Sequence, residues 1–450
     1  MSNSSRRQHH RTQRRPNTWF LGGLAILSAA ALAACSGSPG VGSGGPSASA
    51  PSATSTAPAA QAALGVELAA DQVPWDQVGP GWVLATWSPA KGLHPGETPP
   101  EGQPMVGPAT LYLLNPEGGR YPITTFPVVG ADPATNNPGH TPDLVAWSGD
   151  GKQALFQDQG TCPMTHDPEG WHCTDPDAAE QYTTMTEVDL VTGTQHSFTV
   201  DGHVYGAYSR PTGQAILLSS FGNGQTSLRR VDLNGYEQLT FPTDRLGAAG
   251  KYGGSYLASP DGTQLVLGAA NGLVMVGNDG VLGRQLSTPG LTGCTPVRWW
   301  NPGEVLARCS TGGPSSTASH LVRVPVNGGA PTALTPVNSG QDGPNYGDSN
   351  AWQLPSGTFL QSSGACGMVF LSKLTADMKV TPVTVPGVDE GNSVSVAGVA
   401  ADKLVLQAQL GCGSGISLLT YDPAANTSTV LLGPPLNGGA VTDAILYPTS

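Results

Sequence analysis

A short motif recurs along this 450-residue chain and constrains its fold more than any other feature. Residues 147–156 and 258–267 both place a tight Asp-Gly turn between two apolar stretches. Asp-Gly supplies the positive φ that a two-residue β-hairpin requires. Weaker copies of this plan lie at residues 77–84, 208–217, 300–306, 352–360 and 400–406. The seven copies predict a repeat protein built from β-hairpins.

Each copy is followed by a third apolar stretch that ends in a polar turn, and then by a fourth. The unit is therefore about four strands, and one such sheet cannot bury both of its faces. Packing the sheets around an axis solves this problem, so the sequence predicts an all-β chain, a β-propeller of seven four-stranded blades. Six blades are the alternative, because the copy at 77–84 is the weakest. The last apolar stretch, residues 440–447, could pair with the N-terminal strands and close the ring.

The composition agrees with this fold class. The chain contains 61 glycines and 40 prolines, and only 12% of its residues are charged. Glycine and proline at this density place turns between many short elements, which is typical of all-β proteins. No long stretch shows the period of an amphipathic helix.

The turn Ser259-Pro260-Asp261-Gly262, with its close variant at residues 148–151, resembles the repeats of TolB-like and WD-type propellers. The resemblance extends over most of the chain from about residue 75 and assigns residues 64–450 to the propeller domain. It implies a binding module rather than a catalyst.

The N-terminus has the pattern of a bacterial export signal. Five arginines precede an apolar run at residues 19–27, which is too short for a convincing membrane-spanning helix. The run ends in Leu32-Ala33-Ala34-Cys35, which resembles the lipobox of bacterial lipoproteins. The resemblance implies a signal peptide at residues 1–34 and acylation of Cys35, with a plain secretory signal cut nearby as the alternative. The expected location is the extracytoplasmic face of the cell membrane, held to the lipid bilayer by acyl chains.

Residues 35–63 are rich in Ser, Gly, Pro and Ala and contain almost no bulky apolar side chain. Such a segment cannot bury enough surface to offset its ordering entropy, so it is expected to be a disordered tether. The formal net charge is −12 and becomes −17 when the signal peptide and its five arginines are removed. An acidic protein of this kind is not expected to bind nucleic acid or to lie flat on anionic lipid.

Six cysteines remain after Cys35, an even number that favours disulfides outside the cytoplasm. Cys294 and Cys309 are symmetric about the Asn301-Pro302 turn and would face each other in a hairpin. Two further relations concern the remaining four: Cys162 and Cys173 would close a compact loop, and Cys366 and Cys412 fall at the same offset in successive repeats. Spacing alone leaves all 15 pairings of six cysteines open.

No catalytic signature is present, and no cofactor or metal is predicted. The sequence lacks Gly-x-Ser-x-Gly, the phosphate-binding Gly-x-x-x-x-Gly-Lys motif and His-Glu-x-x-His. The densest polar cluster is the loop 162–173, with His166, Asp167, Trp171 and His172 as candidate binding residues. Zinc is the alternative there, but the spacing matches no common zinc pattern and a disulfide-stapled loop is favoured. Turn aspartates such as Asp261 are expected to bond their own backbone.

The long connections 88–109 and 157–183 follow the second strand of the first two repeats, so both are expected on the rim opposite the hairpin turns. Binding residues concentrate on loops that a rigid scaffold holds. The favoured function is therefore a binding or scaffold module for an envelope protein or polymer, with the site on this rim. The alternatives are a glycan-active enzyme with carboxylates at the axis, and a sensor subunit of a membrane signalling system.

Overall fold

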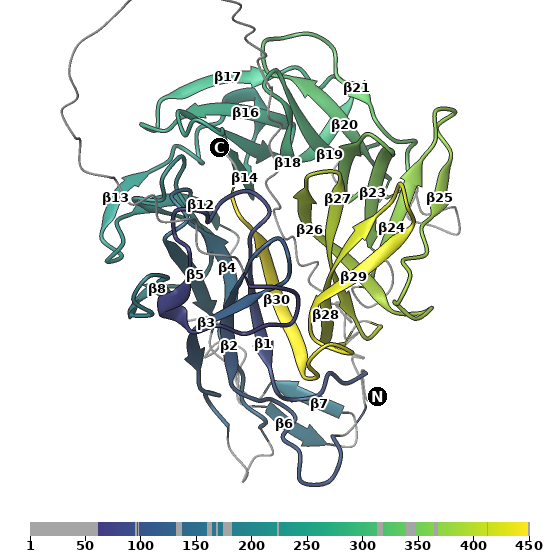
Figure 1. The fold of residues 1–450 in the computed structure, drawn as a ribbon. Coiled ribbons are helices and arrows are strands. Elements are labelled where there is room, and N and C mark those ends of the chain that lie inside the picture. The colour runs from purple at the N-terminus through teal and green to yellow at the C-terminus, as the bar shows by residue number, and fades with distance from the viewer. Residues whose placement is uncertain are drawn as a thin grey trace, which may run out of the picture.

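The fold was determined from a computed structural model, which describes residues 62–448 with internal gaps. The gaps are residues 95–96, 98, 132–136, 160–163, 168–169, 174–181, 223–224, 313–317, 339–346, 364–367 and 412. Strands dominate the described residues, and the helices there are the short 3₁₀ turns η1 (Ala70–Gln72) and η2 (Gly247–Ala249). Seven four-stranded antiparallel sheets form a ring of blades (Figure 1). The chain is a seven-bladed β-propeller, as the repeats predict, and the six-blade alternative is wrong.

Blades 1 to 4 are described here from the innermost strand outward. Blade 1 contains β30 (Ala440–Leu446), β1 (Val83–Ser88), β2 (Ala109–Leu114) and β3 (Arg120–Phe126). Blade 2 contains β4 (Asp143–Trp147), β5 (Gln153–Asp158), β8 (Tyr182–Asp189) and β9 (Gln195–Asp201). Blade 3 contains β10 (His203–Tyr208), β11 (Ile216–Gly222), β12 (Gln225–Val231) and β13 (Glu237–Thr240). Blade 4 contains β14 (Tyr252–Ala258), β15 (Gln264–Ala269), β16 (Gly272–Gly277) and β17 (Leu282–Leu286).

Blades 5 to 7 follow the same order. Blade 5 contains β18 (Leu291–Asn301), β19 (Glu304–Thr311), β20 (Ser319–Pro325) and β21 (Thr332–Ala333). Blade 6 contains β22 (Asn350–Leu354), β23 (Gly357–Ser363), β24 (Val369–Leu374) and β25 (Val380–Pro382). Blade 7 contains β26 (Ser393–Ala400), β27 (Lys403–Gln409), β28 (Gly415–Asp422) and β29 (Thr427–Leu432). A separate hairpin, β6 (Met164–Asp167) and β7 (Gly170–Cys173), is inserted between β5 and β8.

The ring is closed by the C-terminal strand. β30 pairs antiparallel with β1, with Val83 opposite Leu446 and Thr86 opposite Asp443. In Figure 1 the yellow strand β30 lies beside β1, from the other end of the chain. The predicted closure by residues 440–447 is confirmed, and it leaves no open sheet edge between the first and last blades.

The hairpin turns explain why the motif repeats. Gly262 has φ +71°, a conformation that side chains disfavour, and the carboxylate of Asp261 accepts hydrogen bonds from Ser259 Oγ and Thr263 N. These bonds lower the pKa of Asp261. The expectation that turn aspartates bond their own backbone is therefore confirmed here, and the turn fixes the register of β14 and β15.

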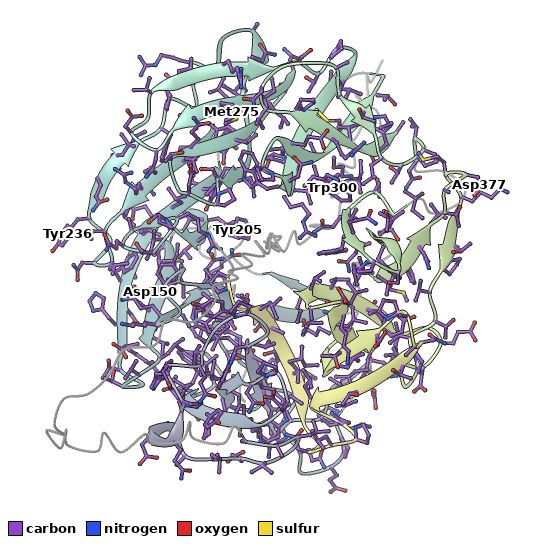
Figure 2. The ribbon with its side chains drawn as sticks, turned by 45° about the horizontal axis from the view of Figure 1, so that its top comes forward. Asp150, Tyr205, Tyr236, Met275, Trp300 and Asp377 are labelled. Carbon is purple, nitrogen blue, oxygen red and sulfur yellow. A yellow bond between two sulfur atoms is a disulfide. The ribbon has the colours of Figure 1, made fainter. Side chains whose placement is uncertain are left out.

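The core consists of apolar layers between neighbouring blades. Trp299 packs with the layer between blades 4 and 5 and donates from Nε1 to Ala258 O at 2.9 Å, whereas Trp300 packs with the layer between blades 5 and 6. The two tryptophans face opposite sides of β18, as adjacent strand residues must. In Figure 2, Tyr205 and Trp300, from innermost strands, lie on the inner side of the ring, and Tyr236 and Asp377 lie at its outer edge.

The ring has two rims that differ in their connections. The rim with the turns from first to second and from third to fourth strand is called the hairpin rim. The opposite rim, called the loop rim, carries the connections from second to third strand and from blade to blade. This alternation follows from the antiparallel order of each blade, and it decides where long insertions can project.

Candidate functional site

The two longest connections between paired blade strands lie on the loop rim above neighbouring blades. One joins β1 to β2 in blade 1, and the other joins β5 to β8 in blade 2 and contains the hairpin β6–β7. The innermost strands of these blades, β30 and β4, contact each other. The candidate site is therefore the loop rim at the seam between blades 1 and 2.

Four titratable side chains lie at this seam, and we call them the rim cluster: His140, Asp143, Asp158 and Asp443. His140 precedes β4, and its Nε2 lies 2.8 Å from Oδ1 of Asp158 at the end of β5. Asp143 begins β4, opposite Gln157, and Asp443 lies on β30. Because β30 and β4 are adjacent innermost strands, three carboxyl groups and one imidazole meet at the seam between blades 1 and 2.

Asp443 is half-buried and is held by hydrogen bonds from both blades of the seam. Its Oδ2 accepts from Thr86 Oγ1 at 2.8 Å, and its carboxylate also accepts from Thr442 Oγ1 and from the backbone N–H of Leu144 in blade 2. Burial raises the pKa of Asp443, and these hydrogen bonds oppose that shift. Asp443 therefore joins blade 1 to blade 2 through hydrogen bonds.

Asp143 has a different environment. It is half-buried, and no hydrogen bond holds its carboxyl group among the described residues. Burial, followed by the charges of Asp443 and Asp158, raises the pKa of Asp143 to about 7, and His140 opposes the shift. The hydrogen bond to Asp158 raises the pKa of His140. Asp143 can therefore carry a proton near neutral pH and can donate a hydrogen bond to a ligand or accept one.

A recurring polar position explains why Asp443 is structural. On the second strand of several blades, one buried side chain bonds the backbone of the next blade. Gln157 Oε1 accepts from Gly206 N at 3.1 Å, Ser219 Oγ donates to Gly254 O at 2.8 Å, and Gln407 Nε2 donates to Thr442 O at 2.6 Å. Gln361 and Val394 repeat the contact between blades 6 and 7. We call these residues the interblade clasps.

In blade 1 the clasp position is Thr86, and among the described residues its side chain bonds no backbone group of blade 2. Thr86 instead donates to Asp443, which reaches Leu144. In blade 5 the same position is Arg308, which pairs with the buried Asp348 near the start of blade 6, with Arg308 Nη2 3.1 Å from Oδ2. The carboxylates of Asp443 and Asp348 thus link neighbouring blades, whereas no hydrogen bond among the described residues gives Asp143 this role.

The candidate residues from the sequence lie on the same rim but outside the described side chains. His166 and Asp167 belong to β6, and Trp171 and His172 belong to β7. The backbone register pairs His166 with Trp171 and Thr165 with His172. Their role in binding stays a prediction.

One of the cysteine predictions can be compared with the structure. Cys294 on β18 and Cys309 on β19 form a disulfide with a Cα–Cα distance of 4.1 Å, on the hairpin that the sequence predicts. Cys162, Cys366 and Cys412 lie outside the described residues, as does the side chain of Cys173. Their pairings stay predictions.

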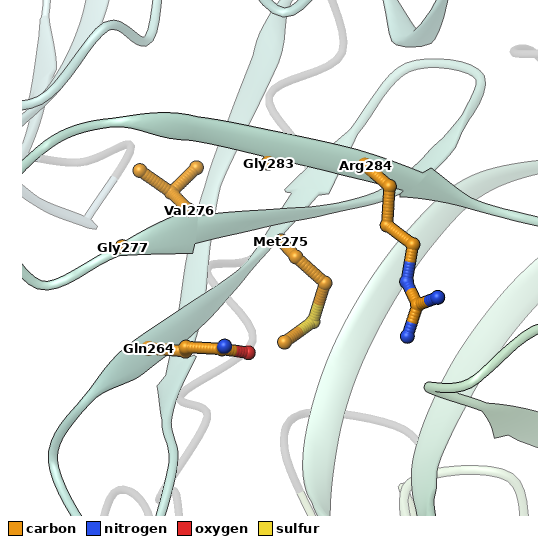
Figure 3. A pocket seen from close by; sticks show the side chains of 6 residues that line it. All are labelled: Gln264, Met275, Val276, Gly277, Gly283 and Arg284. Atoms are coloured by element: carbon orange, nitrogen blue, oxygen red, sulfur yellow. The ribbon is translucent and has the colours of Figure 1, made fainter.

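A small hollow lies on blade 4, away from the loop rim. Its lining comes from the hairpin-rim ends of β15, β16 and β17 and includes Gln264, Met275 and Arg284 (Figure 3). Its volume is about 200 Å³, below the roughly 300–1,000 Å³ of typical small-molecule sites. Arg284 donates there to Val326 O and Asn327 Oδ1 of blade 5, so the hollow marks a contact between blades.

Metal-binding groups and membrane-spanning helices are both absent from the described residues. No group of three or more His, Cys, Asp or Glu side chains there is arranged to hold a metal ion. Within the same residues, no helix has the length and apolar character needed to cross a membrane.

The sequence analysis missed the rim cluster. Its members come from sequence positions about 300 residues apart and meet only because the ring closes through β30. A signal was present, since Asp443 is the single charged residue in the apolar stretch 440–447. The interblade clasps also have a sequence signal, a buried polar residue that directly follows three apolar residues on the second strand, as at Gln157, Ser219 and Gln407.

The similarity of this chain to known proteins is low. No protein-family model matches the sequence, and no curated protein matches it. Among solved structures, TolB from Acinetobacter baumannii is similar at 14% identity and a TM-score of 0.39, over 84% of this chain and 71% of that one. The WD40 propeller domain of Doa1 is similar at 12% identity and a TM-score of 0.39, over 77% and 99%.

A prolyl endopeptidase is also similar, at 14% identity and a TM-score of 0.41, over 76% of this chain. This chain spans only 47% of the length of that peptidase. The propeller assignment rests on this chain's own strand pairing.

Proposed function

We propose that this protein is a lipid-anchored, extracytoplasmic β-propeller that binds an envelope protein or polymer at the loop rim of blades 1 and 2. The observation that carries the proposal is the placement of the two long connections above adjacent blades, beside the rim cluster. Long loops on a rigid scaffold are the usual location of binding residues. Asp143 and His140 add polar groups that can contact a ligand at the same seam.

The path of the N-terminal segment supports anchoring at the opposite rim. Ala62 is buried, and its carbonyl accepts from Asn115 Nδ2 at 2.7 Å in the β2–β3 turn, which belongs to the hairpin rim. Gly119 makes this approach possible, because a Cβ there would lie 2.2 Å from Ala62 O. A tether from Cys35 would thus reach the propeller at the hairpin rim and leave the loop rim unobstructed.

Anchoring is tested with Cys35→Ser in the full chain. The wild type is expected in the membrane fraction with incorporated labelled fatty acid, and the variant in the soluble extracytoplasmic fraction without label. Cys294→Ser is the matched control, since it removes a cysteine of the propeller and should leave the fatty-acid label in place. Label retained by Cys35→Ser would contradict the proposal.

Binding is tested by site-specific photo-crosslinking in cells. A photoreactive residue replaces Glu101 on the loop rim or Tyr236 on the hairpin rim, both of which are exposed. A defined crosslinked partner is expected from position 101 and not from 236. The same partner from both positions, or from 236 alone, would place the site elsewhere.

The raised pKa of Asp143 favours one second candidate, a glycan-active enzyme. A carboxyl group that keeps its proton near neutral pH can act as a general acid at a glycosidic bond. This function predicts hydrolysis of chromogenic glycosides that Asp143→Asn abolishes while binding is kept. Asp150→Asn, in a hairpin turn, is the matched control.

A further inference from the structure

The hairpin half of the ring wall carries cations that no carboxylate compensates. Arg298 lies on β18, the innermost strand of blade 5, and only 5% of it is exposed. Its Nη1 donates to Ala351 O on β22 at 2.8 Å, and its guanidinium carbon lies 5.4 Å from the centre of the Trp352 ring. Arg298 therefore reaches from the innermost strand of blade 5 onto that of blade 6.

The guanidinium of Arg298 has hydrogen-bonding capacity left over. It carries five N–H donors, and Ala351 O is the one acceptor that they reach among the described residues. None of its nitrogens is both sealed from solvent and unpartnered. The remaining N–H groups therefore border space that solvent reaches.

The electrostatics of this position are unusual for an acidic protein. Burial alone lowers the pKa of Arg298 to about 10, and no charged neighbour contributes. Arg210, at the β10–β11 turn on the hairpin rim, also has its pKa lowered by burial alone. A desolvated cation without a counter-charge is costly, and an anion that supplied both charge and acceptors would remove that cost.

We propose that Arg298 is the centre of an oxyanion-binding site on the inner wall of the ring, which takes a carboxylate or phosphate group of a ligand. The planar guanidinium can donate a forked pair to two oxygens while Nη1 keeps its bond to Ala351 and Trp352 holds one face. The site is distinct from the loop rim. Arg298 pairs with Leu306 in blade 5, and Asp143 pairs with Gln157 in blade 2. Compared between blades, the position of Arg298 is two residues nearer the hairpin turn, which is about 7 Å along the strand.

The test uses the full-length protein in detergent, with inorganic phosphate and acetate as separate probes at constant ionic strength. Titration calorimetry should show binding of at least one probe to the wild type, and the stronger one identifies the group that the site prefers. Arg298→Met, which keeps the side-chain volume, should weaken that binding at least about tenfold. The affinity of Arg298→Lys for the probe should lie between those of the wild type and Arg298→Met, because lysine offers a point charge rather than a forked pair of donors.

Arg230→Gln is the matched control, because Arg230 also donates to a backbone carbonyl of the next blade, Asn278 O at 2.7 Å, but from an outer strand. It should bind the probe like the wild type. Absence of binding to the wild type, or equal binding by Arg298→Met, would overturn the proposal and leave Arg298 as a link between blades.

A second measurement does not depend on the folding of a variant. Phenylglyoxal modifies arginine, and trypsin does not cleave after a modified residue, so modification of Arg298 yields the peptide 285–308 after reduction. Phosphate or acetate at saturating concentration should protect Arg298 and leave modification of exposed Arg245 unchanged. The proposed site would be contradicted if the anions reduced the modification of Arg298 and Arg245 equally, or if they reduced neither.

Discussion

Side chains of opposite charge are partly or fully buried in the loop-rim half and the hairpin-rim half of the ring, and burial shifts their pKa values in opposite directions. At the loop rim, carboxyl groups crowd together, and burial raises the pKa of Asp143 and Asp443. Toward the hairpin rim, burial lowers the pKa of Arg298 and Arg210. Asp143 can relieve the cost of burial by taking up a proton near neutral pH, whereas arginine stays charged. The first half therefore responds to pH and the second to anions.

The largest expected effect on stability comes from reversing the charge of Arg298, which cannot relieve the cost of its burial by losing its proton. Arg298→Glu places a carboxylate beside Ala351 O and the ring of Trp352, with no cation nearby. The free energy of unfolding should fall by about 3–5 kcal/mol at pH 8. Denaturant unfolding followed by tryptophan fluorescence measures this change. A loss below that of Arg298→Met would mean that the wall tolerates either charge.

The next effect separates charge from hydrogen bonding at Asp443. Asp443→Leu leaves the Leu144 N–H and the Thr86 hydroxyl without their shared acceptor, which should cost about 2–4 kcal/mol of unfolding free energy. Asp443→Asn keeps an acceptor oxygen and should stay within about 1 kcal/mol of the wild type. Urea unfolding of both variants measures the difference. Equal losses would show that the negative charge, rather than the acceptor, holds blades 1 and 2.

A smaller effect concerns pH. The folded-state pKa of Asp143, about 7, lies above the ordinary aspartate value of 3.8, so the folded protein binds more protons between these values. Stability from this group is fully present below pH 4 and is lost as pH rises to about 7. Asp143→Asn should reduce that loss by about 1–2 kcal/mol, a figure lowered for the partial exposure of the carboxyl. Thermal melts between pH 4 and pH 8 measure it, and an unchanged pH profile would contradict the assignment.

The smallest effect serves as a reference for charges that water screens. Glu67 pairs with Arg120 at 2.9 Å on the outer edge of blade 1, with its side chain 43% exposed. Glu67→Gln should change the free energy of unfolding by about 0.5 kcal/mol at low salt and less at high salt. Chemical denaturation at two salt concentrations tests this. A loss as large as that of Asp443→Leu would remove the contrast between buried and exposed charges.

The sequence predicts the architecture because the propeller repeats locally. Each Asp-Gly turn and its flanking apolar stretches specify one hairpin, and the disulfide of Cys294 and Cys309 follows from one such hairpin. The rim cluster and the Arg298 site involve different blades, so their residues share no spacing. Arg298 and Asp443 are nevertheless isolated charges within apolar strands, and that pattern marked both positions in advance.

The pairing of β1 with β30 joins residues separated by more than 350 positions, as in the contact of Thr86 with Thr442. A chain that crosses a membrane N-terminus first cannot complete blade 1 until residue 440 and those after it have also crossed. With the export that we propose, six blades could therefore assemble beside three strands that still lack their innermost partner. Under that proposal, the time spent in translocation would set how long the edge of β1 stays open to other chains, and the pairing of β30 would end the exposure to aggregation.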